Sequence, residues 1–375
     1  MKVDLFLEQM KDMGVDFFTG VPDSQLKALC DTLYCDYTLG KDHVVAANEG
    51  AAVGIAAGHY LATGKPALVY MQNSGIGNAV NPIASLLDEK VYNIPAVFVV
   101  GWRGEPGIHD EPQHVFQGEI TVELMELLKI KSFVLTKDTT EEEFMSYVNI
   151  SKEILESGKS ISFIIKKGAL KSEKKAIYQN DYNMSREHAI KVIAENISGE
   201  DIFVSTTGKA SRELFEIREA LGQGHEKDFL TVGSMGHASM IAMGIALEKK
   251  DRTVWCMDGD GAVIMHLGSM AICAGTACEN LIHIVLNNGA HETVGGMPVD
   301  YGNADFSKIA KAVGYTECIC VDTEEALKQA VINLKNKSGI KLLEVKVSLG
   351  SRDDLGRPTT TPIENKEAFM KYIQK

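Results

Sequence analysis

The chain has 375 residues, of which 45% are hydrophobic and 24% are charged, and its formal net charge at pH 7 is −13. That length suits two domains, and no apolar stretch is long enough to cross a bilayer. The acidic balance, without a basic stripe, argues against nucleic acid or membrane lipid as a partner. The seven cysteines form no C-x-x-C pair, which argues against disulfide frameworks and zinc sites. The N-terminal stretch lacks the pattern of a secretory signal, so we expect a cytoplasmic protein.

The first half alternates helical patterns with short apolar runs rich in β-branched residues. These runs are DFFTGV, HVVAA, PALVYM, AVFVVG, SFVLT and SISFIIK. They lack a two-residue alternation, which is typical of strands buried on both faces, and the helices between them indicate crossovers in a parallel sheet. We therefore predict a first α/β domain over residues 1–170.

The stretch from Lys166 to Met184 is polar and lysine-rich, and we predict a linker at residues 171–184. Ser185 is a candidate N-cap for a helix with the sequence REHAIKVIAENI. The apolar runs then resume as DIFVST, FLTVG, RTVWCMDG, LIHIVLNN, ECICV and KLLEVKV. The pattern predicts a second α/β domain over residues 185–375, so the fold class is two doubly wound parallel-sheet domains.

Two turns in the second half follow predicted strands and carry oxygen-bearing side chains. One is Asp258-Gly259-Asp260-Gly261, and the other is Asn287-Asn288-Gly289. Open α/β sheets bind ligands at the carboxyl ends of their strands, so Asp260 and Asn288 can converge if the two strands lie close together. One carboxylate and one amide oxygen suit Mg²⁺, which takes its other ligands from carbonyls, water and phosphate. Gly259 and Gly261 allow close backbone approach, and a helix expected after Ala262 would direct its amides at a phosphate.

This pair of turns resembles the cofactor motif of thiamine-diphosphate enzymes such as pyruvate decarboxylases and acetolactate synthases. The resemblance implies thiamine diphosphate and Mg²⁺ as cofactors, with the metal held by Asp260, the Asn288 side chain and the backbone carbonyl of Ala290. Gly259, Gly261 and Ala262 would lie beside the diphosphate, and Ala262 stands where many relatives have serine. The alternative interpretation is that both motifs are ordinary tight turns.

Two further segments of the second half match the family. Ser234 and Met235 lie in a Gly-Ser-Met-Gly segment similar to the element that places an apolar side chain under the coenzyme. Met235 would hold the two rings of the coenzyme in a bent conformation; otherwise it is a core methionine. Thr207 and Gly208, after another predicted strand, would contact the diphosphate.

Glu49 follows a predicted strand and begins a helix of small residues. It resembles the family's activating glutamate, which favours the imino tautomer of the pyrimidine and so generates the ylid. The alternative is an acid favoured by the helix N-terminus. Because the family pairs this domain with the diphosphate domain of a neighbouring subunit, the resemblance implies a homo-oligomer, at least a dimer, with a shared active site.

The length leaves no room for the central third domain of the large thiamine decarboxylases. The chain resembles instead the compact phosphonopyruvate and sulfopyruvate decarboxylases, through TGVPDSQLK, GEPGIHDEPQHVFQG and GSRDDLGRPTTTPIENK. We expect the substrate to meet Asp23, Ser24, Asn73, Arg103, His109 and His114. The alternatives are a solvated loop or a second metal site around His109, and phosphonate binding by Arg352 and Arg357 is as good an interpretation as a charged loop.

The resemblance implies non-oxidative decarboxylation of phosphonopyruvate to phosphonoacetaldehyde and CO₂ through a ylid and an enamine, in phosphonate biosynthesis. The substrate would be a small anionic 2-keto acid. Alternative functions are sulfopyruvate decarboxylation, acetolactate-type carboligation, or a non-catalytic nucleotide-binding α/β protein. Sequence alone does not separate phosphonopyruvate from sulfopyruvate, because the two differ mainly by one charge and one proton.

Overall fold

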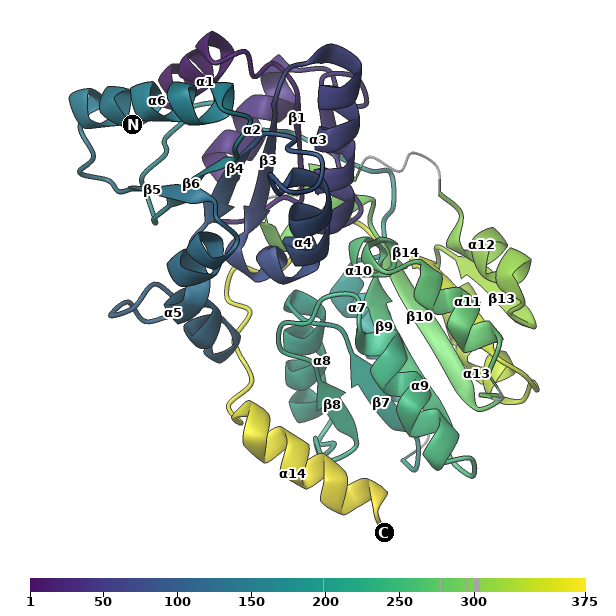
Figure 1. Cartoon of the computed structure of the whole chain (residues 1–375). Coiled ribbons are helices and arrows are strands. Elements are labelled where there is room, and N and C mark those ends of the chain that lie inside the picture. The colour runs from purple at the N-terminus through teal and green to yellow at the C-terminus, as the bar shows by residue number, and fades with distance from the viewer. Residues whose placement is uncertain (198, 277, 295, 300–303) are drawn as a thin grey trace. The chain divides into compact units, whose positions relative to one another are not determined.

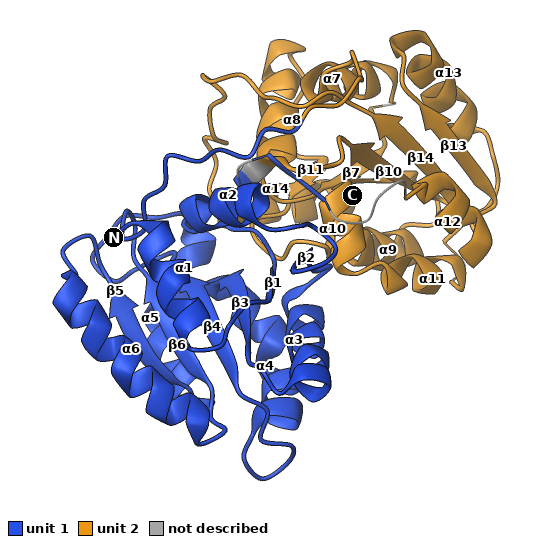
Figure 2. Cartoon of the chain, turned by 90° about the horizontal axis from the view of Figure 1, so that it is seen from above, with its two compact units in different colours: residues 1–178, 294–300 blue, residues 179–293, 301–375 orange. Residues whose placement is uncertain are grey.

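The computed structural model describes residues 1–197, 199–276, 278–294, 296–299 and 304–375. It contains two compact units, which Figure 2 shows in blue and orange. Unit 1 comprises residues 1–178 and 294–300, and unit 2 comprises residues 179–293 and 301–375. Each unit is built on one six-stranded parallel sheet with helices on both faces (Figure 1). The predicted fold class is therefore confirmed.

The sheet of unit 1 has the strand order β2-β1-β3-β4-β6-β5. Its strands are β1 (Phe18–Gly20), β2 (His43–Val45), β3 (Ala67–Gln72), β4 (Ala96–Gly101), β5 (Lys131–Leu135) and β6 (Ile161–Ile165). Its helices are α1 (Val3–Asp12), α2 (Lys27–Asp36), α3 (Glu49–Thr63), η1 (Asn73–Gly75), α4 (Ile76–Pro82), η2 (Ile83–Leu87), α5 (Pro112–Leu127) and α6 (Glu141–Glu156). Each apolar run predicted in the first half overlaps one of these strands.

Successive residues of the central strands β3 and β4 pack into different cores. On β3, Leu68 and Tyr70 join a core formed with α1, α2 and α6, whereas Val69 and Met71 join one formed with α3 and α4. A strand that is apolar on both sides satisfies both cores at once, because its side chains alternate between the faces. The missing two-residue alternation in the sequence has this physical origin.

The sheet of unit 2 has the order β13-β14-β10-β9-β7-β8. Its strands are β7 (Ile202–Ser205), β8 (Asp228–Leu230), β9 (Val254–Gly259), β10 (Leu281–Asn287), β13 (Glu317–Val321) and β14 (Lys341–Lys346). Its helices are α7 (Arg186–Asn196), α8 (Lys209–Ala220), α9 (Ala238–Glu248), α10 (Asp260–Met265), α11 (Gly268–Ala274), α12 (Phe306–Val313), α13 (Glu324–Lys335) and α14 (Pro362–Ile373). The remaining short elements of the chain are β11 (Ala290–His291), η3 (Glu292–Val294) and β12 (Met297–Pro298), and β12 belongs to unit 1.

Helix starts in unit 2 follow local capping chemistry. Ser185 accepts a hydrogen bond from the His188 amide and so caps α7, as predicted. The helix expected after Ala262 starts earlier than that: α10 begins at Asp260 and already contains Ala262. Gly259, still in extended backbone, is its N-cap, so the aspartate opens the helix. No helix in the described ranges is both long and apolar enough to span a bilayer.

A buried ion pair joins α8 to the start of β8 inside unit 2. The Nε and Nη2 atoms of Arg218 each donate to one carboxylate oxygen of Asp228 at 2.9 Å. The two side chains are 0% and 1% exposed. A desolvated charge depends on its partner, because water cannot replace the lost hydrogen bonds.

We expect Asp228→Ala to lower the free energy of unfolding of unit 2 by about 3–5 kcal/mol, because it leaves Arg218 buried and uncompensated. Urea unfolding followed by circular dichroism measures this change. The matched control is Lys308→Ala, which removes an ion pair with Asp305 whose lysine is 84% exposed, and which should lower the free energy of unfolding far less. An equal decrease in the free energy of unfolding of the two variants would show that the buried pair stabilises unit 2 no more than an exposed pair.

Candidate active site

The carboxyl ends of β9 and β10 bring the two predicted metal-binding turns together. The strands pair in parallel, with Leu286 opposite Gly259. Beyond that pair, Oδ1 of Asp260 accepts from the Gly261 amide at 2.8 Å, and Oδ2 accepts from the Gly289 amide at 2.7 Å. One amide comes from each turn, so a single carboxylate joins two segments that are distant in sequence.

The groups around this carboxylate form a set of hard oxygen donors. Asp260 is 4% exposed and Asn288 is 5% exposed. The Oδ1 atom of Asn288 accepts from the Ala290 amide at 3.0 Å, which folds the turn so that Ala290 lies beside it. A carboxylate, an amide oxygen and a backbone carbonyl are ligands that Mg²⁺ accepts, with water and phosphate completing its shell. The donor set fits the predicted metal, and the binding itself stays a prediction.

Two loops of unit 2 are hydrogen-bonded to each other near the start of α8. The Thr207 hydroxyl accepts from the Gly233 amide at 2.9 Å. Gly208, the N-cap of α8, has φ 99° and ψ −146°, a conformation that essentially only glycine adopts. Ser234 has φ 46°, so its backbone is left-handed without being glycine. The first amides of α8 have no acceptor within the helix, as at any helix N-terminus, and a contact of Thr207 and Gly208 with a diphosphate stays a prediction.

Met235 lies against the Asp-Gly turn. A Cβ atom built on Gly261 would be 3.5 Å from Cε of Met235 and 3.4 Å from the His291 ring. A Cβ on Gly259 would meet no atom within 4 Å, so that backbone borders open space. The structure thus gathers the predicted apolar residue and the predicted diphosphate-binding glycines in unit 2. Burial lowers the pKa of His291 to about 4, which makes it a neutral neighbour at pH 7.

Glu49 begins α3 in unit 1, as predicted. Its side chain is buried, and Oε2 accepts from Nδ2 of Asn78 at 2.8 Å. A Cβ on Gly75 would lie 2.3 Å from Oε1, so only glycine lets η1 pass this close to the carboxylate. The Asn78 side chain therefore holds Oε2, and the missing side chain of Gly75 leaves room for Oε1.

Asp23 lies at the carboxyl end of β1 and is fully buried. Its Oδ1 accepts from Nε2 of Gln72 at 2.6 Å, and its Oδ2 accepts from the Gln25 amide at 2.9 Å. Burial raises the pKa of this carboxyl, with the two hydrogen bonds opposing the shift. Asp23 therefore retains a proton to higher pH than an exposed aspartate.

Arg103 follows β4 and is bound by Asp110. Its Nε donates to Oδ2 at 2.8 Å and its Nη2 to Oδ1 at 2.5 Å, while Nη1 lies 3.3 Å from the Ser24 hydroxyl. The hydrogen bond from Arg103 lowers the pKa of Asp110 to about 2, against the effect of burial. The pair holds the guanidinium in one orientation, with Nη1 directed at Ser24.

Asn73 is buried and bonded on both ends of its amide. Its Nδ2 donates to the Arg103 carbonyl and to the Thr121 hydroxyl, both at 2.8 Å, and its Oδ1 accepts from the Arg103 amide at 3.1 Å. These contacts tie the end of β3 to the segment after β4. The structure gives Asn73 a supporting part beside Arg103, and its contact with a substrate stays a prediction.

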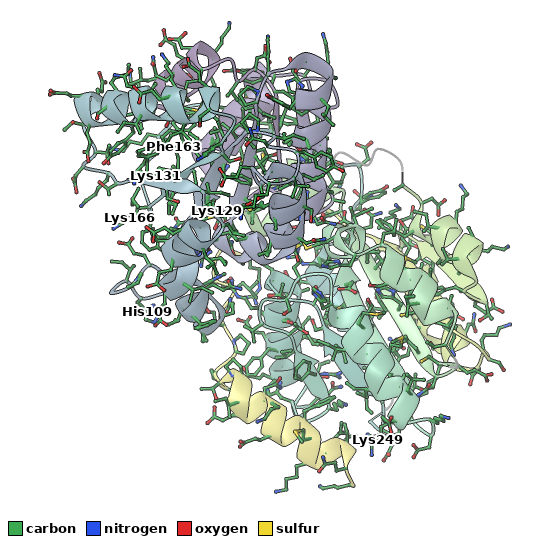
Figure 3. All side chains as sticks on the ribbon, in the orientation of Figure 1. His109, Lys129, Lys131, Phe163, Lys166 and Lys249 are labelled. Atoms are coloured by element: carbon green, nitrogen blue, oxygen red, sulfur yellow. The ribbon has the colours of Figure 1, made fainter. Side chains whose placement is uncertain are left out.

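The two predicted histidines differ in their surroundings. His109 is exposed on the loop before α5, where Figure 3 labels it. His114 lies on α5, and burial together with Arg103 lowers its pKa to about 4. His114 is consequently neutral at pH 7 and lies in the same electrostatic environment as Arg103 and Asp110, whereas His109 is open to solvent.

Both halves of the chain match family models. The model described as the N-terminal binding domain of thiamine pyrophosphate enzymes matches residues 2–127, and that of the C-terminal binding domain matches residues 207–345. The phosphonopyruvate decarboxylase of Streptomyces viridochromogenes is 32% identical, over 96% of this chain and 92% of that protein. The chain belongs to the thiamine pyrophosphate enzyme family. The resemblance drawn from the motifs is confirmed.

Two further relatives cover almost the whole chain. The phosphonopyruvate decarboxylase of Streptomyces hygroscopicus is 31% identical over 98% of this chain and 92% of its own. The sulfopyruvate decarboxylase of Methanosarcina acetivorans is 26% identical over 98% of this chain and 95% of its own. Thiamine diphosphate is the coenzyme of the family, and the donor set and glycine-lined space of unit 2 fit its diphosphate end.

Sequence reasoning missed the residues that surround Asn288 in this thiamine pyrophosphate enzyme. Glu292 accepts a hydrogen bond from the Asn288 side chain and pairs with Arg186 and Lys209. The only sequence signal was an acid shortly after the Asn-Asn motif. Arg186 and Lys209 lie far from it in the chain, and only the fold brings them near.

A separate polar cluster is buried between β9 and β10. Nε2 of His283 lies 3.0 Å from Oδ2 of Asp258, and Sγ of Cys256 donates to the same oxygen at 3.5 Å. The Tyr315 hydroxyl is 3.4 Å from Nδ1 of His283. The three possible ligand atoms of Cys256, Asp258 and His283 lie within 4.8 Å of one another, but they already bind each other. We interpret the cluster as a bridge between the strands that carry the two turns.

Arg352, the first arginine of the C-terminal loop, forms ion pairs with acidic residues of unit 2. Nε of Arg352 donates to Glu187 at 2.9 Å, and other atoms of the guanidinium pair with Glu216 and with Asp354 at 3.1 Å. The hydrogen bond that Arg352 donates to Glu216 raises the pKa of the guanidinium. These contacts favour the charged-loop interpretation of Arg352 over phosphonate binding.

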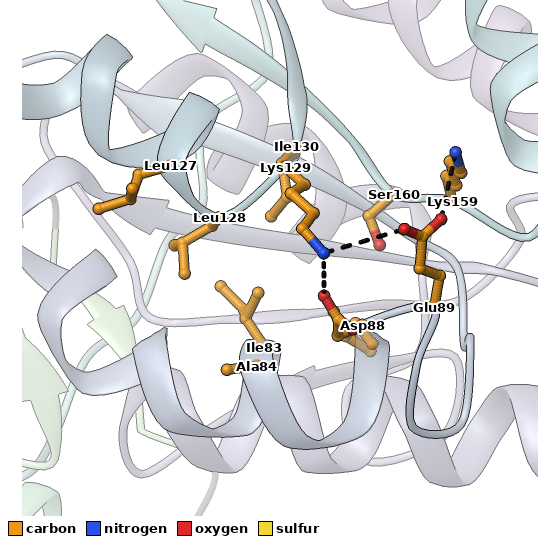
Figure 4. Close-up of a pocket in the computed structure, with 11 residues that line it drawn as sticks. Ile83, Ala84, Asp88, Glu89, Leu127, Leu128, Lys129, Ile130, Lys159 and Ser160 are labelled. Carbon is orange, nitrogen blue, oxygen red and sulfur yellow. Dashed lines mark hydrogen bonds and ion pairs between the residues drawn. The ribbon is translucent and has the colours of Figure 1, made fainter.

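A pocket of about 170 Å³ lies elsewhere on unit 1, near the amino ends of β5 and β6 (Figure 4). Lys129 pairs with Asp88 at 3.0 Å and with Glu89 at 3.8 Å, and Lys159 pairs with Glu89 at 3.3 Å. The floor is apolar, formed by Leu127, Leu128 and other residues. Its charges compensate each other, and it lies at the end of the sheet opposite the strand ends described above, so it is not the candidate active site.

We expect Asp260→Asn to weaken Mg²⁺-dependent uptake of thiamine diphosphate by more than about 100-fold, beyond the usual effect of losing an outer partner of a metal ligand. The substitution removes the negative charge and turns an NH₂ group toward a backbone amide that it cannot accept from. Titration calorimetry with Mg²⁺ present measures the change. Asp354→Asn, at a side chain 80% exposed in the same unit, is the control and should bind normally. Unchanged uptake in Asp260→Asn would remove the metal assignment.

Proposed function

We propose that this enzyme decarboxylates phosphonopyruvate without oxidation, releasing CO₂ and phosphonoacetaldehyde. The observation that carries the proposal is that Asp260 joins both cofactor turns through the Gly261 and Gly289 amides, on a chain aligned almost end to end with two phosphonopyruvate decarboxylases. The sulfopyruvate decarboxylase is less similar, at 26% identity. The order of similarity supports phosphonopyruvate as the preferred substrate.

Unit 2 would hold the coenzyme by its diphosphate. Asp260, Asn288 and the carbonyl of Ala290 would bind Mg²⁺, and the amides that open α8 and α10 would bind phosphate oxygens. When bound, thiamine diphosphate supplies a nucleophilic carbon and an electron sink for the departing carboxylate. Met235 would support the coenzyme rings from the side of Gly261.

Glu49 would exchange a proton with the pyrimidine ring of the coenzyme. Asn78 occupies Oε2, so Oε1 is the oxygen that would meet a ring nitrogen. Burial strengthens this hydrogen bond, because no water competes for the carboxylate. The proton held between Oε1 and the ring would control the tautomer that activates the coenzyme.

The cluster of unit 1 around Arg103 would bind the substrate. Asp110 holds the guanidinium so that Nη1 lies 3.3 Å from the Ser24 hydroxyl, and these two neighbouring donors suit an oxygen of an anionic group. Asp23, whose pKa is raised by burial, would lie near the reacting carbons as a group able to hold a proton. His114 would add a neutral imidazole, and His109 would approach from the solvent side.

The decisive experiment for the substrate compares CO₂ release from phosphonopyruvate, sulfopyruvate and pyruvate with Mg²⁺ and thiamine diphosphate supplied. We expect kcat/KM to be highest for phosphonopyruvate, and at least about 30-fold lower for pyruvate, since a missing charged partner costs roughly 2–5 kcal/mol at a buried site. Faster release from sulfopyruvate would establish the alternative function. Fastest release from pyruvate would contradict the proposed anion site.

Glu49→Gln should reduce kcat by at least about 100-fold, the usual contribution of a positioned acid or base, while the coenzyme still binds. Glu141→Gln is a matched control, because Glu141 also opens a helix of unit 1 but is exposed. It should turn over normally. If Glu49→Gln turned over like the control, the proton-transfer assignment would be lost.

We propose that the enzyme is at least a dimer whose subunits share each active site, as expected from the family. The same substitutions test this arrangement. Two inactive variants, Glu49→Gln and Asp260→Asn, would be mixed after reversible dissociation. Activity should return, because some mixed sites combine an intact Glu49 with an intact Asp260. No recovery in verified mixed oligomers would contradict a shared site.

A further inference from the structure

Glu292 forms the centre of a buried hydrogen-bond network in unit 2. Its Oε2 accepts from Nδ2 of Asn288 at 2.7 Å and from Nη1 of Arg186 at 2.8 Å. Its Oε1 lies 3.5 Å from Nζ of Lys209. The side chain is 9% exposed, so water contributes little to its solvation. Three donors from three segments therefore compensate one carboxylate.

The network is anchored on a second carboxylate. Nε and Nη2 of Arg186 donate to the two oxygens of Glu213, each at 2.7 Å, and Glu213 is 1% exposed. This two-point contact fixes the plane of the guanidinium and leaves Nη1 directed at Glu292. Glu292 is consequently held in place before any ligand binds.

The contact with Asn288 decides which end of its amide faces the metal turn. An asparagine amide has an oxygen and an NH₂ group of nearly equal size, so its orientation depends on its neighbours. An ionised carboxylate only accepts hydrogen bonds, and therefore it takes the NH₂ end of Asn288. The oxygen is then directed away from Glu292, and it accepts from the Ala290 amide in the turn. An NH₂ group in that position would repel a cation.

We propose that Glu292 is a positioning residue that selects the oxygen of Asn288 as the metal ligand. The proposal rests on the proposed function, because it takes the turn of Asn288 as the Mg²⁺ site. Glu292 also connects that turn to Lys209, the first residue of α8 beside the predicted diphosphate loop. One carboxylate thus sets the orientation of the metal ligand and restrains the residue that follows the phosphate-binding turn.

The test is a double-mutant cycle between Glu292→Gln and Asn288→Asp. We expect Glu292→Gln to weaken Mg²⁺ binding by about 10- to 100-fold, the usual effect of losing an outer partner of a metal ligand. Asn288→Asp should also bind Mg²⁺ more weakly, because its carboxylate faces that of Glu292. In the double variant the glutamine NH₂ can donate to the new carboxylate, and either aspartate oxygen can bind the metal. Mg²⁺ affinity should therefore recover to within about 10-fold of the original, a gain that independent losses could not give.

Mg²⁺ affinity is measured by titration calorimetry at saturating thiamine diphosphate, beside thermal unfolding of each variant. Glu216→Gln is the control, because Glu216 pairs with Arg352 and should leave Mg²⁺ affinity unchanged. Additive losses in the double variant, or normal affinity in Glu292→Gln, would overturn the proposal. If Glu292→Gln alone does not fold, the folded double variant decides: Mg²⁺ binding supports the proposal, and its absence overturns it. If the unaltered protein bound neither Mg²⁺ nor the coenzyme, the proposed function itself would fail.

Discussion

The parallel pairing of β9 with β10 is the constraint on which the candidate site of unit 2 depends. The register places Leu286 opposite Gly259, so the two strands end side by side at the same edge of the sheet. The Asp260 carboxylate can then bind one amide from each turn. A shift of either strand by one residue would send its side chains to the opposite face of the sheet and separate the turns. The metal site is in this sense a consequence of strand register.

Buried polar contacts help to set the register of β9 and β10, in addition to apolar packing. His283 and Asp258 lie 3.0 Å apart across β9 and β10, close to Asp260 and Asn288 in sequence. Leaving either group unpaired in the core would cost the desolvation of a polar group, whereas a slipped apolar strand loses less. The Arg186–Glu213 pair restrains the other side of the site in the same way. The same buried polar contacts thus favour one strand register and fix the positions of the residues in the candidate site.

The sequence was sufficient for the architecture and for the residues that chemistry marks locally. Apolar runs predicted every strand of both sheets, and Glu49 begins α3 as expected, because periodicity and strand-end position are local signals. It was insufficient for partners distant in the chain. Nothing near Asn288 indicates that Arg186 will approach Glu292, and nothing near Arg103 shows that Asn73 will bind its backbone. Such pairs depend on tertiary contacts, which no local pattern encodes.

The acidic composition and the proposed anionic substrate are compatible because the cations of each unit's candidate site are paired in advance. Arg103 is bound by Asp110, and Arg186 by Glu213 and Glu292. Such pairs reduce the long-range attraction of an anionic ligand to the protein. They also fix the guanidinium planes, so that less side-chain entropy is lost when a ligand binds. At a net charge of −13, recognition of an anion must therefore come from short-range donors with fixed geometry, and not from a general positive field. If the substrate binds as proposed, a narrow choice between similar anions would follow from that geometry, because an oriented donor pair rejects a group whose oxygens or protons do not match it.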